Sequence, residues 1–120
     1  MSMIKLGVTI MIFGFLANLF SCGAAEKVDI PALVQSGALV IDVRTPAEFS
    51  GGAIQGAVNI PYDEIVARIG KVEADKSRPI LVYCHSGARA ATAKKSLEQI
   101  GYTQVVNGGG FSKVRKLLGQ

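Results

Sequence analysis

The chain has 120 residues, of which 49% are apolar and 18% charged, and its formal net charge is +4. These values fit one globular domain and exclude an intrinsically disordered chain. The basic residues are spread along the sequence, and the local clusters at 94–95 and 113–116 are interpreted as solvated helix faces, because no aromatic residues are interleaved with a basic block. We therefore expect no nucleic-acid partner.

The N-terminal segment has the pattern of an export signal. No charged residue lies between Lys5 and Glu26, most of the stretch is apolar, and it ends in the small residues Gly-Ala-Ala at 23–25. A basic start, an apolar centre and a small-residue boundary are typical of a secretory signal peptide. We predict that residues 1–25 are a signal peptide, cleaved before Glu26, and that residues 26–120 form a periplasmic or cell-envelope domain.

Two other outcomes remain open for this segment. The sequence Leu-Phe-Ser-Cys22 resembles a bacterial lipobox, and lipidation of Cys22 would anchor the protein in a membrane. About 20 apolar residues also suffice to cross a bilayer if no cleavage occurs. Cleavage before Glu26 would leave Cys84 as the only cysteine and would allow no disulfide framework. A lone cysteine in an exported domain is either buried and inert or reactive.

The rest of the chain predicts short strands that alternate with helices. Asp29 and Pro31 are typical of a helix cap and first turn, and Gly37 of the helix end. The apolar runs at 39–43 and 80–83 indicate strands that are buried on both faces of a parallel sheet. Between them we expect a loop at 45–56 with one helical turn at 47–49, a strand at 57–60, a helix at 63–69 that Gly70 ends, and a surface connection at 71–79.

The clearest helix spans 88–100 and ends at Gly101, because apolar residues recur on one of its faces. After it we expect a strand at 104–107, a flexible turn at 108–110, and a closing helix at 111–118 with Phe111, Val114, Leu117 and Leu118 pointing inward. The alternation implies an α/β fold, a small parallel sheet flanked by helices on both faces. Ligands of such sheets lie beyond the C-terminal ends of the strands, where Cys84 stands.

Cys84 ends an apolar strand and is followed by a short turn and a helix. Gly87 permits the turn to direct its backbone N–H groups inward, and the positive end of the helix points to the same place. A sulfur at that place is stabilised as the thiolate, which is the nucleophilic form. The alternative is an ordinary core cysteine, because free cysteine is among the most buried residue types.

The length of this loop bears on the class of anion that it could hold. Cysteine phosphatases close a similar cradle with an arginine six positions after the cysteine. Here Arg89 lies five positions after Cys84, and position 90 is alanine. A ring that is one residue shorter is too small for a tetrahedral phosphoryl group, whereas the single outer sulfur of a persulfide would fit.

Four motifs, in order along residues 30–118, resemble those of the single-domain rhodaneses, which are thiosulfate sulfurtransferases, here of the periplasmic type. Ala53 stands where the family usually has histidine. The motifs are Ile-Asp-Val-Arg-Thr-Pro-Ala-Glu-Phe at 41–49, Gly-Ala-Ile-Gln-Gly-Ala-Val-Asn-Ile-Pro at 52–61, Cys-His-Ser-Gly-Ala-Arg-Ala at 84–90 and Asn-Gly-Gly-Gly-Phe at 107–111.

The resemblance implies a two-step transfer of sulfur. Cys84, the catalytic nucleophile, takes the outer sulfur of a small anionic donor such as thiosulfate as a persulfide, and passes it to cyanide or a thiol. No metal and no organic cofactor is implied, and we expect a monomer. The N–H groups of the following loop are expected to hold the persulfide anion. The residues assigned to this substrate-binding loop are His85, Ser86, Gly87, Ala88 and Arg89.

The roles of several neighbours remain open. Arg89 either attracts an anionic donor or forms a structural ion pair with Asp42 or Glu48, because buried charges must be paired. Glu48 stands where some two-domain relatives place a substrate-binding arginine, so that contact is not carried over. His85 either orients or protonates the substrate or faces solvent. Asp42 and Arg44 are expected to be structural.

Three rival functions follow from the same residues. The first is a persulfide carrier module that delivers sulfur to a partner protein. The second is a hydrolase of small oxyanion esters, which the loop length disfavours. The third is a catalytically silent binding domain, which the presence of Cys84 argues against.

Overall fold

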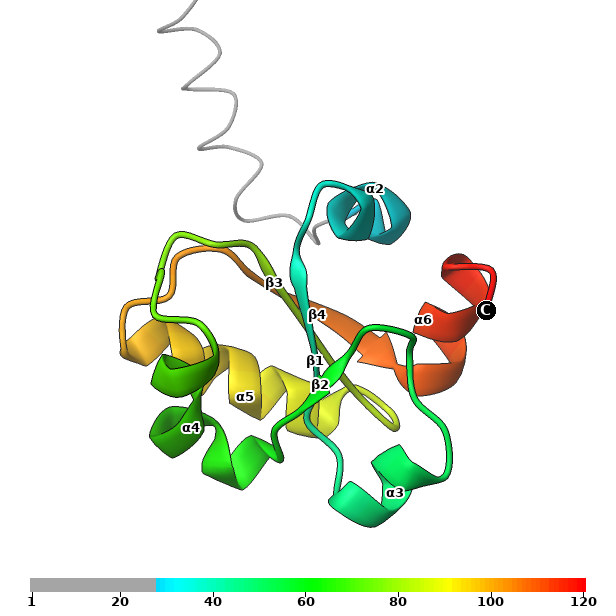
Figure 1. Cartoon of the computed structure of the whole chain (residues 1–120), viewed down its shortest axis with the longest axis horizontal. Helices are drawn as coiled ribbons and strands as arrows, with labels where there is room; N and C mark the ends of the chain where they lie inside the picture. Colours follow the sequence, from blue (N-terminus) through cyan, green and yellow to red (C-terminus); the bar gives the residue numbers. More distant parts are fainter. Residues whose placement is uncertain (1–27) are drawn as a thin grey trace, which may run out of the picture.

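The computed structural model describes residues 28–120 (Figure 1). The predicted signal peptide, its two alternatives and Cys22 lie outside the described residues and stay predictions. Among residues 28–120, no helix is both long and apolar enough to cross a membrane. In chain order the elements are α2 (Ile30–Gln35), β1 (Leu39–Asp42), α3 (Pro46–Ser50), β2 (Val58–Asn59), the 3-10 turn η1 (Tyr62–Glu64), α4 (Ile65–Val72), β3 (Ile80–Cys84), α5 (Ala88–Gln99), β4 (Val105–Gly110) and α6 (Phe111–Leu117).

The four strands form one parallel sheet in the order β2-β1-β3-β4, which confirms the predicted α/β class. Strand β3 lies between β1 and β4, and all five of its residues are buried. Its register with β1 runs from Leu39 opposite Ile80 to Asp42 opposite Tyr83. Because helices cover both faces of such a strand, its sequence is continuously apolar rather than alternating.

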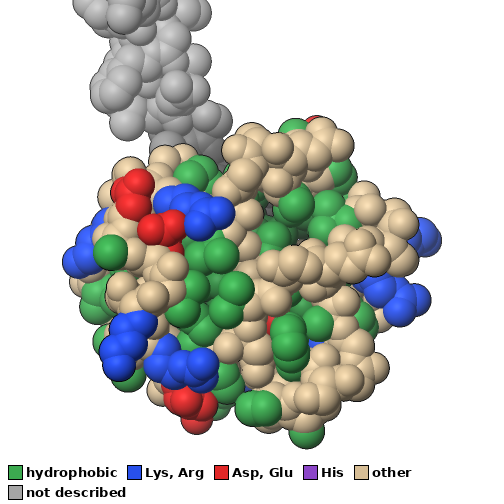
Figure 2. Space-filling view, viewed as in Figure 1, with side chains coloured by type: hydrophobic (Ala, Val, Ile, Leu, Met, Phe, Trp, Pro, Cys, Tyr) green, Lys and Arg blue, Asp and Glu red, His purple; other side chains and the backbone are tan. Residues whose placement is uncertain are grey.

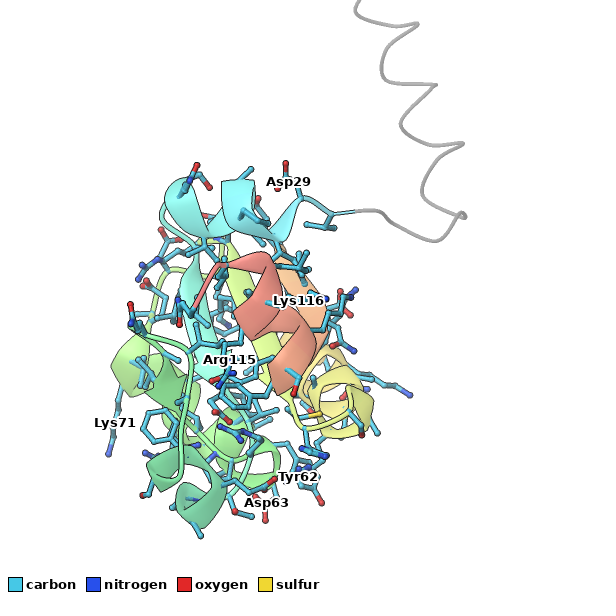
Figure 3. All side chains as sticks on the ribbon, turned by 90° about the vertical axis from the view of Figure 1, so that its right-hand side faces the viewer. Asp29, Tyr62, Asp63, Lys71, Arg115 and Lys116 are labelled. Atoms are coloured by element: carbon cyan, nitrogen blue, oxygen red, sulfur yellow. The ribbon has the colours of Figure 1, made fainter. Side chains whose placement is uncertain are left out.

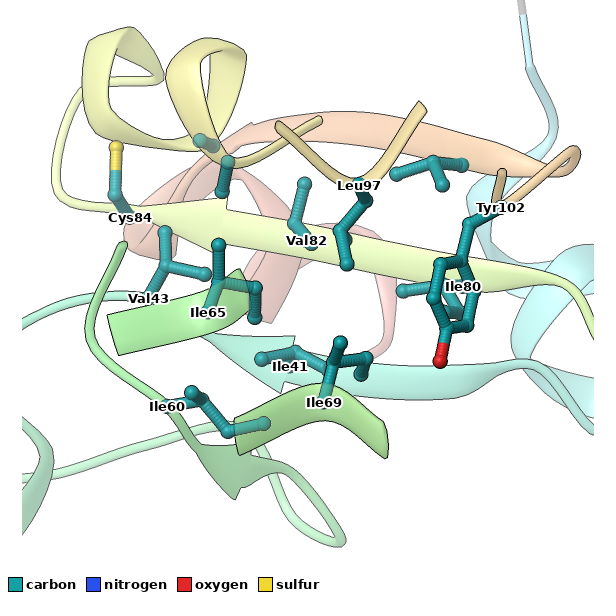
Figure 4. Close-up of a cluster of buried hydrophobic side chains, with 13 residues drawn as sticks. Ile41, Val43, Ile60, Ile65, Ile69, Ile80, Val82, Cys84, Leu97 and Tyr102 are labelled. Carbon is teal, nitrogen blue, oxygen red and sulfur yellow. The ribbon is translucent and has the colours of Figure 1, made fainter. Parts of the chain in front are cut away.

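The sheet has a hydrophobic core on each face, because successive strand residues point to opposite sides. Helices α4 and α5 cover one face, where Ile41, Val82 and Cys84 belong to the larger core (Figure 4). Helices α2 and α6 cover the other face, where Leu81 and Tyr83 belong to the second core. The Cys84 side chain therefore packs in the core on the α5 face, while its backbone belongs to β3.

Side-chain caps fix the starts of the two short helices that precede β1 and β2. Asp29 accepts a hydrogen bond from the Ala32 N–H at 3.1 Å and begins α2, as the sequence predicts. Thr45 and Glu48 form a reciprocal capping box at the start of α3, so the helical turn expected inside the loop is a five-residue helix. This capping box fixes the position of the Glu48 carboxylate at the start of α3, where it pairs with Arg89.

The prediction that Gly70 ends the helix at 63–69 is wrong. The 3-10 turn η1 occupies the predicted start, and α4 begins at Ile65 and continues through Gly70 to Val72. A glycine in a helix costs about 1 kcal/mol relative to alanine. Burial of Ile65 and Ile69, each 1% exposed, is large enough to offset that cost.

The predicted flexible turn at 108–110 is also wrong, because these three glycines complete strand β4. Gly110 pairs with Cys84 across a register shift in the ladder between β3 and β4. A side chain at Gly108 would lie 3.0 Å from Leu81 and 3.2 Å from Val114, so only glycine lets this strand pass so close to β3 and α6. The glycines here permit close approach rather than flexibility.

One inward residue of the closing helix is also predicted wrongly. Val114 is buried and Phe111 and Leu118 pack against the second core, but Leu117 is 46% exposed. At about 100° per residue, Phe111 and Leu118 lie on one flank of Val114 and Leu117 lies on the other. The core contacts only the first flank.

The basic clusters lie on the outside of helices, as predicted. Arg115 and Lys116 are exposed on α6, and Figure 3 shows them on its outer side. Lys95 is exposed on α5, while Lys94 is half-buried. On the face drawn in Figure 2, the Lys and Arg side chains form separate groups, some beside Asp or Glu, rather than one continuous basic patch.

We predict that Ile69→Ala lowers the free energy of unfolding by about 2–5 kcal/mol, because it leaves a cavity between α4 and the sheet. The matched control is Val66→Ala on the same helix, where the side chain is 54% exposed and the loss should stay within about 0.5 kcal/mol. Urea denaturation followed by circular dichroism measures both. Equal losses in the two variants would contradict the assignment of this buried face.

Candidate active site

Cys84 ends β3 at the C-terminal edge of the sheet, where the sequence places the ligand site. Its side chain is 1% exposed and belongs to the larger core. Figure 4 shows the sulfur beside the turn that leads into α5. Gly87 has a φ of +102° and directs its N–H toward the sulfur, which accepts that hydrogen bond at an N···Sγ distance of 2.9 Å.

Two opposing influences act on the pKa of the Cys84 thiol. Burial is the largest single influence, and it raises the pKa because a thiolate loses hydration. Hydrogen bonds from the backbone N–H groups of Ala90, Gly87, Ser86 and Arg89 act in the other direction, and together they lower the pKa below its ordinary value. The cysteine is therefore buried, as in the core-cysteine interpretation, and yet its environment favours the thiolate.

The other loop residues contribute mainly through their backbone. The side chains of His85, Ser86 and Ala88 are exposed, and the two N–H groups at Ser86 and Gly87 face the sulfur. The exposed position of the imidazole agrees with the solvent-facing interpretation of His85. The cradle thus consists of main-chain dipoles, which small side chains at positions 85, 86 and 88 would preserve, whereas position 87 requires glycine.

Arg89 forms an ion pair with Glu48 and not with Asp42. Its Nη1 and Nη2 donate to Oε1 and Oε2 of Glu48 at 2.7 and 3.0 Å, a two-point contact between α5 and α3. Hydrogen bonds from Arg89, and then from the backbone and hydroxyl of Thr45, lower the pKa of Glu48 to about 2 against the smaller effect of burial. Both side chains remain about one third exposed.

Asp42 is instead paired with Arg44, and both are structural, as the sequence predicts. Nε of Arg44 donates to both carboxylate oxygens at 3.0 Å, and Nη2 donates to Oδ2 at 2.7 Å. The same Nη2 also donates to the Gly52 carbonyl at 2.7 Å, and the guanidinium lies 4.5 Å from the centre of the Phe111 ring. This buried pair therefore ties the loop after β1 to the sheet and to α6.

Asn107, which is not predicted from the sequence as a site residue, supports the Cys84 loop from β4. Nδ2 of Asn107 donates to the Gly87 carbonyl at 3.2 Å, and Oδ1 of Asn107 accepts from the Gly109 N–H at 2.8 Å. Gly109 lies so close that a side chain on Gly87 would meet its Cα at 3.4 Å. The available signal was the Asn-Gly-Gly-Gly-Phe motif at 107–111, in which Asn107 is predicted only as the end of a strand and 108–110 as a flexible turn.

This arrangement is suited to nucleophilic chemistry at sulfur. A thiolate surrounded by N–H donors can attack an electrophilic sulfur, and the same donors can hold the anion that results. In the part of the chain that the structure describes, no three His, Cys, Asp or Glu side chains are grouped so that they could hold a metal ion.

Comparison with known proteins gives the family. The sequence model of the rhodanese-like domain family matches residues 27–117 of this chain. The chain belongs to the rhodanese-like family. Of the relatives, the thiosulfate sulfurtransferase PspE of Escherichia coli is 40% identical over 74 residues, which are 62% of this chain and 71% of that protein. A sulfurtransferase of Allochromatium vinosum is 41% identical over 69 residues, 58% of this chain and 63% of that protein.

A solved structure agrees with this assignment. A rhodanese with anions from E. coli is 39% identical, with a TM-score of 0.62, and the match covers 64% of this chain and 91% of that one. The parallel sheet and its flanking helices are thus those of rhodanese-like domains. The protein is a rhodanese-type sulfurtransferase.

We predict that Asn107→Ala raises the pKa of the Cys84 thiol, because the Gly87 turn loses its support and its N–H turns from the sulfur. The pH dependence of iodoacetamide alkylation measures this pKa. The control is Gln104→Ala, which removes a hydrogen bond from the residue just before β4 to the Ser77 carbonyl and should leave the pKa of Cys84 unchanged. A folded Asn107→Ala protein with an unshifted alkylation profile would contradict the supporting role.

We also predict that Glu48 makes stability depend on pH in the acid range. The pKa of its carboxyl is about 2 in the folded protein and 4.5 ordinarily, so the unfolded chain binds more protons between these values. The stabilisation is therefore present above pH 4.5 and lost as the pH falls toward 2. Melting temperatures of the wild type and of Glu48→Gln should differ above pH 4.5 and converge toward pH 2.

The expected difference is small, because the Glu48–Arg89 pair is partly exposed to solvent. Arg89→Gln removes the other partner and should show the same convergence. Melting curves that remain parallel over the whole range would show that this pair contributes no pH-dependent stability.

Proposed function

We propose that the protein transfers a sulfane sulfur from thiosulfate, or a similar anionic donor, to cyanide or a thiol through a persulfide on Cys84. The observation that carries the proposal is the Cys84 sulfur inside a ring of backbone N–H groups, in a chain that belongs to the rhodanese-like family. The similarity to a protein named thiosulfate sulfurtransferase supports thiosulfate as the donor.

In the first step, the Cys84 thiolate attacks the outer sulfur of thiosulfate. A bond forms between the two sulfurs, and the bond from the outer sulfur to the sulfonate breaks, with its electron pair leaving on sulfite. The outer sulfur keeps the negative charge that it carries in thiosulfate, so the persulfide is an anion, and the charge brought by the thiolate leaves as the second charge of sulfite. No proton needs to move once Cys84 is a thiolate, and the backbone N–H groups around the sulfur lower its pKa and so favour that form.

The N–H groups that favour the thiolate are also suited to the persulfide. They belong to residues 86, 87, 89 and 90, and they are fixed by the start of α5 rather than by mobile side chains. Donors that are already oriented require no reorganisation when the negative charge moves outward by one atom. The loop therefore stabilises both anionic forms of the cysteine.

In the second step, the acceptor attacks the outer sulfur of the persulfide. The bond between the two sulfurs breaks, and its electron pair returns to Cys84 as the thiolate. Cyanide leaves as thiocyanate, and a thiolate acceptor leaves as a new persulfide. The enzyme is regenerated without any other reactant.

We further propose that residues 1–25 are removed on export and that the domain formed by residues 26–120 acts in the periplasm or cell envelope. The uncharged, apolar stretch between Lys5 and Glu26 supports this. Lipidation at Cys22 would instead keep the same domain at a membrane, and the mass of the mature protein distinguishes the two.

The test is the intact mass of the protein before and after incubation with thiosulfate. We expect the wild type to gain one sulfur, about 32 Da, and to lose it when cyanide is added. Cys84→Ser should gain nothing, because the attacking thiolate is absent. A wild-type protein whose Cys84 is alkylated normally but gains no sulfur would reject thiosulfate as the donor and favour the carrier function.

A further inference from the structure

We propose that Glu48 is a specificity-determining residue, which engages the Arg89 guanidinium beside the Cys84 loop and thereby weakens the reaction with doubly charged sulfur donors relative to singly charged ones. The inference rests on the proposed function and names the donor class that the site favours. It follows from the ion pair between Arg89 and Glu48, and from the capping box that holds the Glu48 carboxylate.

Arg89 is the cation that a donor at the Cys84 loop would meet. Its backbone N–H faces the sulfur, and its side chain is 30% exposed. The guanidinium is close enough to Cys84 for the charge of the sulfur to act on it. Arg44, by contrast, is 5% exposed and donates to Asp42 and to the Gly52 carbonyl, so it is not available to a donor from solvent.

Glu48 occupies the edge of Arg89 that would otherwise bind an anionic group. The two planar groups meet through a pair of nearly parallel hydrogen bonds, at 2.7 and 3.0 Å. Arginine binds carboxylates and other oxyanions through this same two-point geometry. A sulfonate group must therefore displace the carboxylate, or bind without the contact that arginine offers best.

Glu48 is itself held in place, so it does not simply swing away. Its Oε1 accepts hydrogen bonds from the N–H and the hydroxyl of Thr45, both at 3.1 Å, as part of the capping box of α3. The backbone N–H of Glu48 donates in turn to the Thr45 hydroxyl at 3.2 Å. Displacing the carboxylate from Arg89 would thus disturb the start of α3 as well.

The electrostatic consequence scales with the charge of the donor. The Arg89 and Glu48 charges cancel at a distance, so a donor that approaches the Cys84 thiolate meets its repulsion without the full compensating charge of Arg89. Because Coulomb energy is linear in charge, the effect of Glu48 on the rate with a dianion should be the square of its effect with a monoanion. This scaling separates a charge effect from a general disturbance of the site.

The decisive variant is Glu48→Gln, since glutamine preserves the size of the side chain and the capping box. The rate constant for persulfide formation is measured by quenched intact-mass analysis, with no acceptor present, at low donor concentration. We use thiosulfate as the dianionic donor and ionised 2-hydroxyethyl persulfide as the monoanionic donor. We expect Glu48→Gln to raise the rate constant roughly five- to tenfold with thiosulfate and two- to threefold with the persulfide.

Two further variants test the mechanism. Glu48→Gln combined with Arg89→Gln should return both rate constants to near the wild-type values, because no cation is then released. Glu73→Gln is the matched control: it removes a carboxylate that pairs with Arg78 at 2.8 Å and precedes β3, away from the sheet edge that carries Cys84. This control should change neither rate constant.

Three results would overturn the inference. They are an unchanged ratio of the two rate constants in Glu48→Gln, a gain that persists in the double variant, and an equal gain in Glu73→Gln. Failure of the proposed function has a different signature, because the wild type would then gain no sulfur from either donor. A wild type that gains sulfur from both, with an unchanged ratio in Glu48→Gln, rejects only the role of Glu48.

Discussion

The hydrogen bond from the Gly87 N–H to the Cys84 sulfur is the contact on which the site depends, because it fixes the turn that brings the other N–H groups to the same point. It requires a φ of +102°, which glycine adopts without strain. The turn is then supported from outside by Asn107 and by the glycines of β4. Residues of β4, which are distant in the sequence, thus stabilise the short turn that follows Cys84.

The same sheet edge carries two ion pairs that differ in burial and in consequence. Asp42 and Arg44 are both nearly inaccessible, and the guanidinium also contacts Gly52 and Phe111, so this pair joins the loop after β1 to the rest of the domain. Breaking a buried pair leaves an uncompensated charge, which makes it costly to change. The Arg89–Glu48 pair is partly exposed, so solvent can hydrate either charge and a substitution of one partner costs less than at the buried pair.

Much of the fold could be predicted from sequence, because buried parallel strands and a capped helix have local signatures. The apolar run that ends at Cys84 and the small-residue turn after it placed the candidate nucleophile correctly. The glycines could not be interpreted in the same way. Gly70 lies inside a helix and Gly108 inside a strand, because packing with distant residues decided their conformation. The partner of Arg89 could not be predicted for the same reason. Asp42 and Glu48 lie close to each other in the sequence, and only the fold shows that Asp42 pairs with Arg44 and leaves Glu48 for Arg89.

The site separates two tasks that one arginine could have combined. The thiolate is stabilised by main-chain N–H dipoles, which carry no net charge and do not depend on the side chain of Arg89. The long-range attraction of an anion depends on net charge, and in the proposed reaction this charge depends on whether Glu48 engages Arg89. Because different atoms perform the two tasks, a substitution at Glu48 can change the charge at the entrance while the N–H groups that hold the sulfur stay in place. A cysteine site of this kind can therefore be adapted to anions of different charge by substitutions on α3, outside the loop that holds the sulfur.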